Sequence, residues 1–137
     1  MRAAVAERPG SPDVLMVREV PIPEPRDGWT LVQVKASGLN RSEIMTRLGY
    51  SPDVRFPRIL GIECVGVIAD SGAKLTTFHS DDRKGAAGRQ PLARIVQGVE
   101  RGVYHACLDR VFTLDQIAEA HRYLEANRAV GKVVVQP

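Results

Sequence analysis

Aromatic residues and cysteines are scarce in this chain of 137 residues. Phe, Trp and Tyr make up 5% of the sequence, so a hydrophobic core has to be built from Val, Ile, Leu and Ala. Neither of the two cysteines, Cys64 and Cys107, lies in a C-x-x-C motif, so the ligand set of a structural zinc site is missing. Two separated thiols favour a reducing compartment, and we expect a cytoplasmic protein.

The sequence also lacks a long apolar run and a block of charge of one sign. No apolar stretch approaches the roughly 20 residues that cross a bilayer, so we expect no membrane span. No charged segment followed by an apolar stretch opens the chain, so we expect no secretory signal. The net charge of +3 is too small, and Lys and Arg are too dispersed, to favour nucleic-acid binding. The composition, with 44% hydrophobic residues, is typical of a soluble globular domain.

Short apolar runs separated by turn-forming residues predict strands in the first half of the chain. Arg2–Ala6 and Val14–Val20 are two such runs, whereas the three prolines of Pro21–Gly28 exclude a central strand. Apolar and polar residues alternate in Trp29–Ser37, which predicts a half-buried strand with one face in water. Two glycines interrupt the predicted strand Gly61–Ala69, and they indicate a bulge, a bend or a close neighbour.

A short helix is predicted between these strands, within Gly38–Tyr50. Ser42 can cap its start through the side-chain hydroxyl, and Gly49 can end it in a left-handed conformation. Arg41 and Arg47 could meet a phosphate from this helix, but we favour solvent-exposed positions for both.

The second half of the chain predicts two helices and short strands. Residues 91–102 carry apolar side chains at i, i+3, i+4 and i+7, with proline in the first turn and glycine after the last. Thr113–Asn127 opens with a T-x-x-Q capping box and places His121 on its inner face, where we favour a hydrogen-bonded core histidine. Strands are predicted at Lys74–Phe78, Arg110–Phe112 and Gly131–Gln136.

Together these elements predict one α+β domain, rich in strands, over residues 1–137. The three consecutive valines of the closing strand indicate that it is covered on both faces and returns to the N-terminal sheet. The glycines and prolines fit either a strongly bent sheet or a partly open β-barrel with short helices.

Two parts of the chain read as pieces of one known sequence pattern. They are VQVKASGLNRSEIMTRLGY with FPRILGIECVGVI, and LDRVFTLDQIAEAHRYLEANRAVGKVVV. The chain resembles medium-chain dehydrogenase/reductases of the zinc-free branch, which includes the quinone oxidoreductases (zeta-crystallin-like). The resemblance implies a GroES-like, partly open β-barrel built from the N- and C-terminal parts of a parent enzyme, here residues 1–70 and 71–137. It also implies NADPH and hydride transfer to a small-molecule quinone or an activated alkene or carbonyl.

The zinc ligands of related enzymes are replaced here. The resemblance implies a cysteine at the position of Asn40 and a histidine at that of Ile62 in zinc-dependent relatives. An amide and an isoleucine do not replace a thiolate and an imidazole, and Glu63 alone does not hold a catalytic zinc. We therefore predict no metal site.

The nucleotide-binding domain of such enzymes has no counterpart in this sequence. None of the twelve glycines forms the G-x-G-x-x-G fingerprint of a dinucleotide-binding fold, and the chain is too short to contain that domain. The two matching parts meet at a seam near residues 69–72. We expect the chain alone to be inactive. The alternative is a non-catalytic module that binds partners or self-associates through the face that the missing domain would expose.

The resemblance implies site residues at four positions. Asn40 and Tyr50 would be catalytic, and Asn40, Glu43 and Lys132 would bind the cofactor. Each has a simpler interpretation: Asn40 as a turn residue, Glu43 as an acid favoured in the first turn of a helix, and Lys132 as a surface lysine. Tyr50 lies in GYSP, one position away from the usual G-x-Y-P pattern.

Overall fold

Eight strands and five short helices make up the computed structural model, which describes residues 1–25, 27, 29–69, 74–79 and 89–137. The strands are β1 (Arg2–Ala6), β2 (Leu15–Glu19), β3 (Val32–Gly38), β4 (Arg58–Ile59), β5 (Glu63–Ile68), β6 (Lys74–His79), β7 (Leu108–Thr113) and β8 (Lys132–Gln136). The helices are η1 (Pro12–Val14) and η3 (Leu114–Gln116), both 3-10, with α1 (Arg41–Arg47), α2 (Arg89–Glu100) and α3 (Ile117–Glu125).

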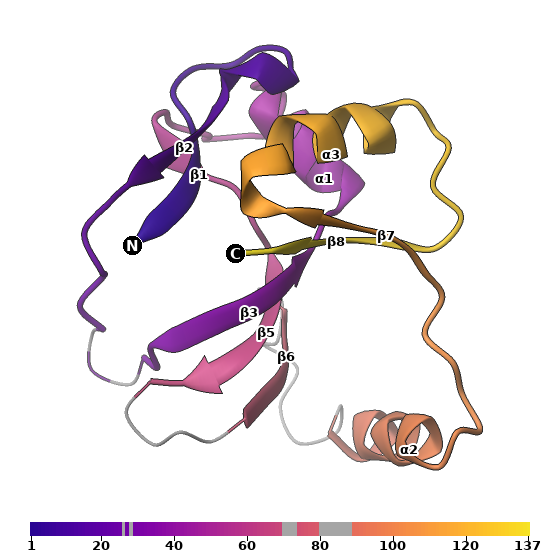
Figure 1. The fold of residues 1–137 in the computed structure, drawn as a ribbon. Helices are drawn as coiled ribbons and strands as arrows, with labels where there is room; N and C mark the ends of the chain where they lie inside the picture. The colour runs from indigo at the N-terminus through magenta and orange to yellow at the C-terminus, as the bar shows by residue number, and fades with distance from the viewer. Residues whose placement is uncertain (26, 28, 70–73, 80–88) are drawn as a thin grey trace.

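In the described residues the strands form two sheets, which leave the barrel partly open (Figure 1). One has the order β2-β1-β4, and the other has the order β6-β5-β3-β8-β7. β3 pairs antiparallel with β8 through Ser37 and Gly38, and β8 runs parallel to β7. The closing strand therefore returns to the N-terminal sheet, and the expected α+β class is confirmed.

A hydrophobic core lies beneath α3, where β1, β2, β7 and β8 meet. Its members are Ala6, Leu15, Leu39, Phe112, Ile117, Ala120, Leu124, Val133 and Val135. In β8, Val133 and Val135 are buried in this core, whereas Val134 on the opposite face is only half-buried. The expectation that β8 is covered on both faces is therefore only partly met.

The helix ends follow the sequence signals in two places and depart from them in one. Thr113 and Gln116 form the predicted capping box, and Gly49 takes a left-handed conformation with φ of 83°. Ser42 does not cap α1, because the helix starts earlier and the residue before it is Asn40, with extended backbone (φ −127°, ψ 149°). The side chain of Asn40 makes no capping hydrogen bond, since its amide faces other partners.

Arg47 is a second correction, because its side chain is fully buried and not in solvent. The guanidinium donates to the carbonyl oxygen of Gly10 and forms an ion pair with Glu125 of α3. α1 packs against α3, so a side chain on this face of α1 does not reach water. The sequence does not show this, because Arg47 and Glu125 are 78 positions apart.

The lower part of Figure 1 is a ribbon formed by β5, β6 and residues 32–36 of β3. The predicted alternation of a covered and a wet face is not seen in β3, since Gln33, Val34 and Lys35 are all exposed and the other residues are half-buried. Gly66 confirms the expected need for space. The strand register shifts next to it in the pairing with β3 and also in the pairing with β6, and a Cβ there would overlap the Gln33 carbonyl oxygen. We call this segment the exposed ribbon.

The predicted helix 91–102 is confirmed as α2, which starts two residues earlier and is followed by left-handed Gly102. In Figure 1 α2 lies apart from the strands and from the other helices. Ile95 and Val99 of its apolar stripe are 53% and 47% exposed. The predicted seam near 69–72 lies, apart from Ala69, outside the described residues, as does most of the loop expected after β6. Among the described helices, none has the length and apolarity needed to span a membrane.

Candidate functional site

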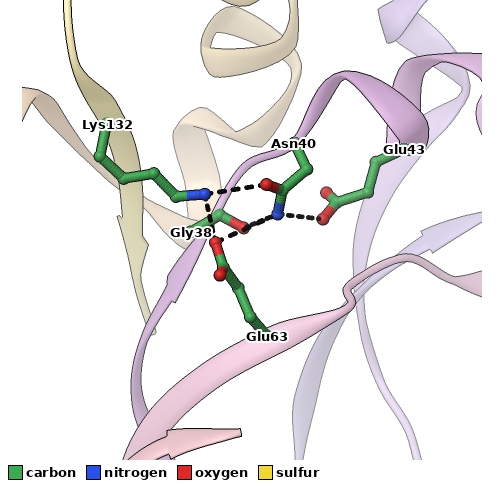
Figure 2. Close-up of polar contacts among 5 residues, drawn as sticks. All are labelled: Gly38, Asn40, Glu43, Glu63 and Lys132. Carbon is green, nitrogen blue, oxygen red and sulfur yellow. Dashed lines mark hydrogen bonds and ion pairs between the residues drawn. The ribbon is translucent and has the colours of Figure 1, made fainter. Parts of the chain in front are cut away.

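Four polar side chains meet where β3, α1, β5 and β8 converge (Figure 2). Asn40 precedes α1 and Glu43 lies in its first turn, while Glu63 and Lys132 are the first residues of β5 and β8. β3 pairs with both β5 and β8, so residues at the starts of those two strands lie on either side of the end of β3. The sheet thereby brings together residues from both ends of the chain.

Asn40 is the centre of this polar cluster. Its side-chain nitrogen donates to the Gly38 carbonyl oxygen at 3.2 Å and to Glu63 Oε1 at 3.1 Å, with Glu43 Oε1 at 3.5 Å. Its Oδ1 accepts a hydrogen bond from Lys132 Nζ at 2.9 Å, and Lys132 also forms an ion pair with Glu63. The amide thus holds an ammonium group and a carboxylate in fixed positions.

Gly38 leaves the space in which this cluster forms. A Cβ at this position would overlap Glu63 Oε1 and the end of the Lys132 side chain. An adjacent pocket of 180 Å³ is lined by Gly38, Glu63 and Lys132 among others, so the ion pair borders an open depression. We call this depression the outer pocket. A glycine at residue 38 is therefore required by close approach of side chains.

Glu43 is the buried acid of the cluster. Burial raises its pKa from 4.5 to about 7, while the hydrogen bond from Asn40 and the charge of Lys132 oppose the rise. A carboxyl group with a pKa near neutrality can hold or release a proton under physiological conditions. The arrangement therefore provides a fixed cation, an ionised carboxylate and a titrating acid.

The structure brings together three of the four residues expected at the site: Asn40, Glu43 and Lys132. Tyr50 is not part of the cluster, and its residue surface is 69% exposed. The functional role of each remains a prediction. Glu63 was considered only as a zinc ligand, and its pairing with Lys132 was missed. The sequence signal for this ion pair is that Glu63 and Lys132 lie near the starts of two strands that are predicted to share a sheet.

The donor set of this cluster does not fit a zinc ion. No group of three His, Cys, Asp or Glu side chains able to hold a metal occurs among the residues that the structure describes. The amide oxygen of Asn40 and the carboxylate of Glu63 both face the ammonium of Lys132. A zinc ion at that point would meet a like charge, and neither a thiolate nor an imidazole to bind it.

A family model and several curated proteins match part of this chain. A family model described as zinc-binding dehydrogenase matches residues 62–135. An uncharacterized zinc-type alcohol dehydrogenase-like protein from Haemophilus influenzae is 40% identical over 72 residues, which cover 53% of this chain and 20% of that protein. The chain thus spans about a fifth of the length of the curated relatives it matches.

Solved structures share the fold. The human synaptic vesicle membrane protein VAT-1 homolog-like protein matches with a TM-score of 0.82 at 12% identity, over 99% of this chain and 98% of that one. A quinone oxidoreductase from Coxiella burnetii matches with a TM-score of 0.80 at 12% identity, over 100% and 99% of the two chains. At these identities the likeness concerns the fold, and it confirms the expected partly open, strand-rich architecture.

Proposed function

Because this chain belongs to the zinc-binding dehydrogenase family, a family of oxidoreductases, we propose that it is the substrate domain of an NADPH-dependent enzyme that works without catalytic zinc. The observation that supports this most directly is the ammonium group of Lys132, held by Asn40 and Glu63. The resemblance assigns zinc ligands to the positions of Asn40 and Ile62. Here a lysine supplies the positive charge beside those positions.

The proposed substrate is a quinone or an activated alkene or carbonyl. Lys132 borders the outer pocket and donates hydrogen bonds, so it suits a substrate oxygen or a cofactor phosphate. Burial raises the pKa of Glu43 to about 7, so this carboxyl group can take up or release a proton near neutral pH, and Asn40 links it to the ion pair. When bound, NADPH would supply the hydride, and the residues of this chain would orient the reactants and manage the proton.

The first experiment asks whether the chain works alone. We expect the 137-residue protein to oxidise NADPH in the presence of a small quinone no faster than a protein-free control, because a dinucleotide-binding fingerprint is absent from its sequence. Robust turnover would refute the proposal that this is one domain of a larger catalyst.

A second experiment asks whether Lys132 meets the cofactor. NADPH is titrated into the ¹⁵N-labelled chain, and we expect amide shift changes at Gly38, Asn40 and Lys132. Lys132→Met should weaken these changes, whereas the exposed Lys35→Met on β3 should leave them as in the wild type. Equal changes in both variants would contradict the proposed role of Lys132.

A third experiment tests zinc independence through a gain of function. The wild type should retain no stoichiometric zinc after incubation and dialysis, measured by mass spectrometry of the metal content. The double variant Asn40→Cys, Ile62→His should gain zinc, since it adds a thiolate and an imidazole next to Glu63. Stoichiometric zinc in the wild type would refute the zinc-free assignment.

Self-association is a second candidate function, supported by the apolar surface of α2. Ile95 and Val99 on the helix are exposed, as are Val103 and Tyr104 just after it. Burial of such a stripe against a second copy of the chain would remove it from water. Light scattering after size exclusion should show a dimer, with monomers for Val99→Asp and unchanged dimers for Val130→Asp, which changes an exposed valine outside α2. A monomeric wild type at high concentration would exclude this candidate.

A further inference from the structure

A large hollow lies inside the partly open barrel, on the inner side of the polar cluster. Its volume is 930 Å³, and its walls come from β1 and β4 on one side and from β3 and β5 on the other. Pockets that bind small molecules usually measure about 300–1,000 Å³. The hollow and the outer pocket share Ser37, Glu63 and Cys64 as a common wall, but Lys132 lines only the outer pocket.

The lining of the hollow is mostly apolar. Four members of the hydrophobic core, Leu15, Leu39, Ile117 and Val135, contribute to it. An apolar cavity of this kind binds apolar molecules better than it binds water: an engineered cavity of about 150 Å³ stays dry and binds benzene. The composition of the walls therefore favours an uncharged, mainly hydrocarbon ligand.

The lining also contains a buried histidine. His121 of α3 is 1% exposed, and neither of its ring nitrogens has a hydrogen-bond partner within the described part of the chain. A buried polar group without a partner costs about 1–3 kcal/mol, so a partner that arrives with a ligand would be bound favourably. The helix stripe around His121 is fixed by Ile117, Ala120 and Leu124, which are buried in the core.

The charges near His121 indicate what kind of partner it would accept. Burial, helped by the positive charge of Arg47, lowers the pKa of His121 to about 4, so the imidazole is neutral at pH 7. Arg47 is itself paired with Glu125, and the pKa of Glu43 in the same lining is raised by burial. A neutral imidazole offers one donor and one acceptor, which matches a hydroxyl group.

We propose that the hollow is a binding site for a small, uncharged, mostly apolar molecule with one hydroxyl group, such as a simple phenol, whose hydroxyl pairs with His121. This site adjoins the one under the proposed oxidoreductase function and shares Glu43 and Glu63 with it, but Lys132 lines only the outer pocket. A phenol places its ring against the apolar walls and its hydroxyl at the buried imidazole of His121, which is without a partner among the described residues. Neither the hydride transfer nor a metal is involved.

The test compares two probes that differ by a single hydroxyl group, p-cresol and toluene, by NMR titration of the ¹⁵N-labelled chain. We expect p-cresol to bind the wild type roughly tenfold more tightly than toluene, which corresponds to about one hydrogen bond. His121→Leu should abolish this preference while toluene binds as before. His105→Leu, which changes an exposed histidine in the segment before β7, should behave as the wild type.

Several results would overturn the proposal. They are equal binding of the two probes to the wild type, no binding of either at millimolar concentration, or a preference for p-cresol that persists in His121→Leu. If that variant does not fold, the imidazole ¹⁵N signals of the wild type decide the question. The His121 signals should move with p-cresol and not with toluene, and their failure to move would refute the pairing.

Discussion

Valines occur both in the part of the molecule under α3 and in the exposed ribbon, but the two regions differ in how far these side chains are buried. In β8, Val133 is 1% exposed and packs beneath α3, whereas Val65 in β5 is 41% exposed. α2 resembles the ribbon, because Ile95 and Val99 of its apolar stripe are exposed. Among the residues whose burial is described, one region therefore has a fully buried core, whereas the apolar side chains of β3 and β5 are half-buried or exposed.

Because of this difference, the residues that stabilise the fold and the residues of the candidate site lie in different parts of the molecule. The core is formed by elements from both ends of the chain, so the two ends hold each other without help from the ribbon. The polar cluster lies at the boundary between the two regions, at the end of β3 that pairs with β8 (Figure 2). We infer that the ribbon and α2 are the surfaces on which a further domain or a second copy would pack.

The largest effect on stability should come from the buried ion pair between α1 and α3. Glu125→Ala leaves the fully buried guanidinium of Arg47 without its carboxylate, so we expect the free energy of unfolding to fall by about 3 kcal/mol. Asp115→Ala removes the exposed partner of Arg2 and should cost less than about 1 kcal/mol. Urea denaturation measures both, and equal losses would show that the α1–α3 contact is not a stabilising centre.

A second prediction concerns the pH dependence of stability, because Glu43 and His121 are both buried and change it in opposite directions. The pKa of Glu43 is raised from 4.5 to about 7, so stability falls as pH rises through this window. The pKa of His121 is lowered from 6.5 to about 4, so stability rises over nearly the same window. In the wild type the two slopes nearly cancel between pH 4.5 and 6.5.

Removing either group should reveal the slope of the other. Relative to wild type, Glu43→Gln should gain about 2–3 kcal/mol from pH 4.5 to 6.5, and His121→Leu should lose a similar amount. The exposed Glu119→Gln serves as the control and should follow the wild-type curve. Urea denaturation at several pH values gives the comparison, and parallel curves for all four proteins would contradict the burial of these groups.

A matched pair of substitutions compares the two regions directly. Val133→Ala removes two methyl groups from the core and should lower the free energy of unfolding by about 2 kcal/mol. Val65→Ala makes the same change in the exposed ribbon and should cost less than about 0.5 kcal/mol. A loss at Val65 as large as that at Val133 would mean that the ribbon is covered in solution, most simply by another copy of the chain.

The smallest expected difference is in local opening. Amides in β8 should exchange hydrogen at rates set by global unfolding, whereas those of α2 should exchange much faster because few contacts oppose its opening. Hydrogen exchange followed by NMR measures both in one sample. Slow exchange throughout α2 would contradict its description as an isolated helix.

Local signals in the sequence predicted most of the fold. The capping box at Thr113, the left-handed glycine at residue 49 and the apolar stripe of α3 each act within a few residues, so the sequence shows them directly. The burial of Arg47 and the lack of a covered face on β3 depend on packing between distant segments. Local pattern does not encode these features.

The candidate site was predicted in part for the same reason. Asn40, Glu43 and Lys132 were named from the resemblance, and the structure places them together. The role of Glu63 as the partner of Lys132 depends on the register of three strands from both ends of the chain. His121 was expected to be hydrogen-bonded, but its nitrogens have no partner in the described residues, since the hollow beside it is apolar.

The pairing of β3 with β8 has a consequence for how the chain could be divided. Residues 1–69 contribute β3, Asn40 and Arg47, while residues 89–137 contribute β8, Lys132 and Glu125. The first fragment carries β3 and β5, and the second carries β7 and β8. The ion pair is divided between them, and Lys132 is the one member of the polar cluster in the second fragment. Two such polypeptides, made separately, would carry complementary surfaces, although β6, which pairs with β5, would belong to neither of them. The two ends of this single chain therefore contact each other much as two different subunits do.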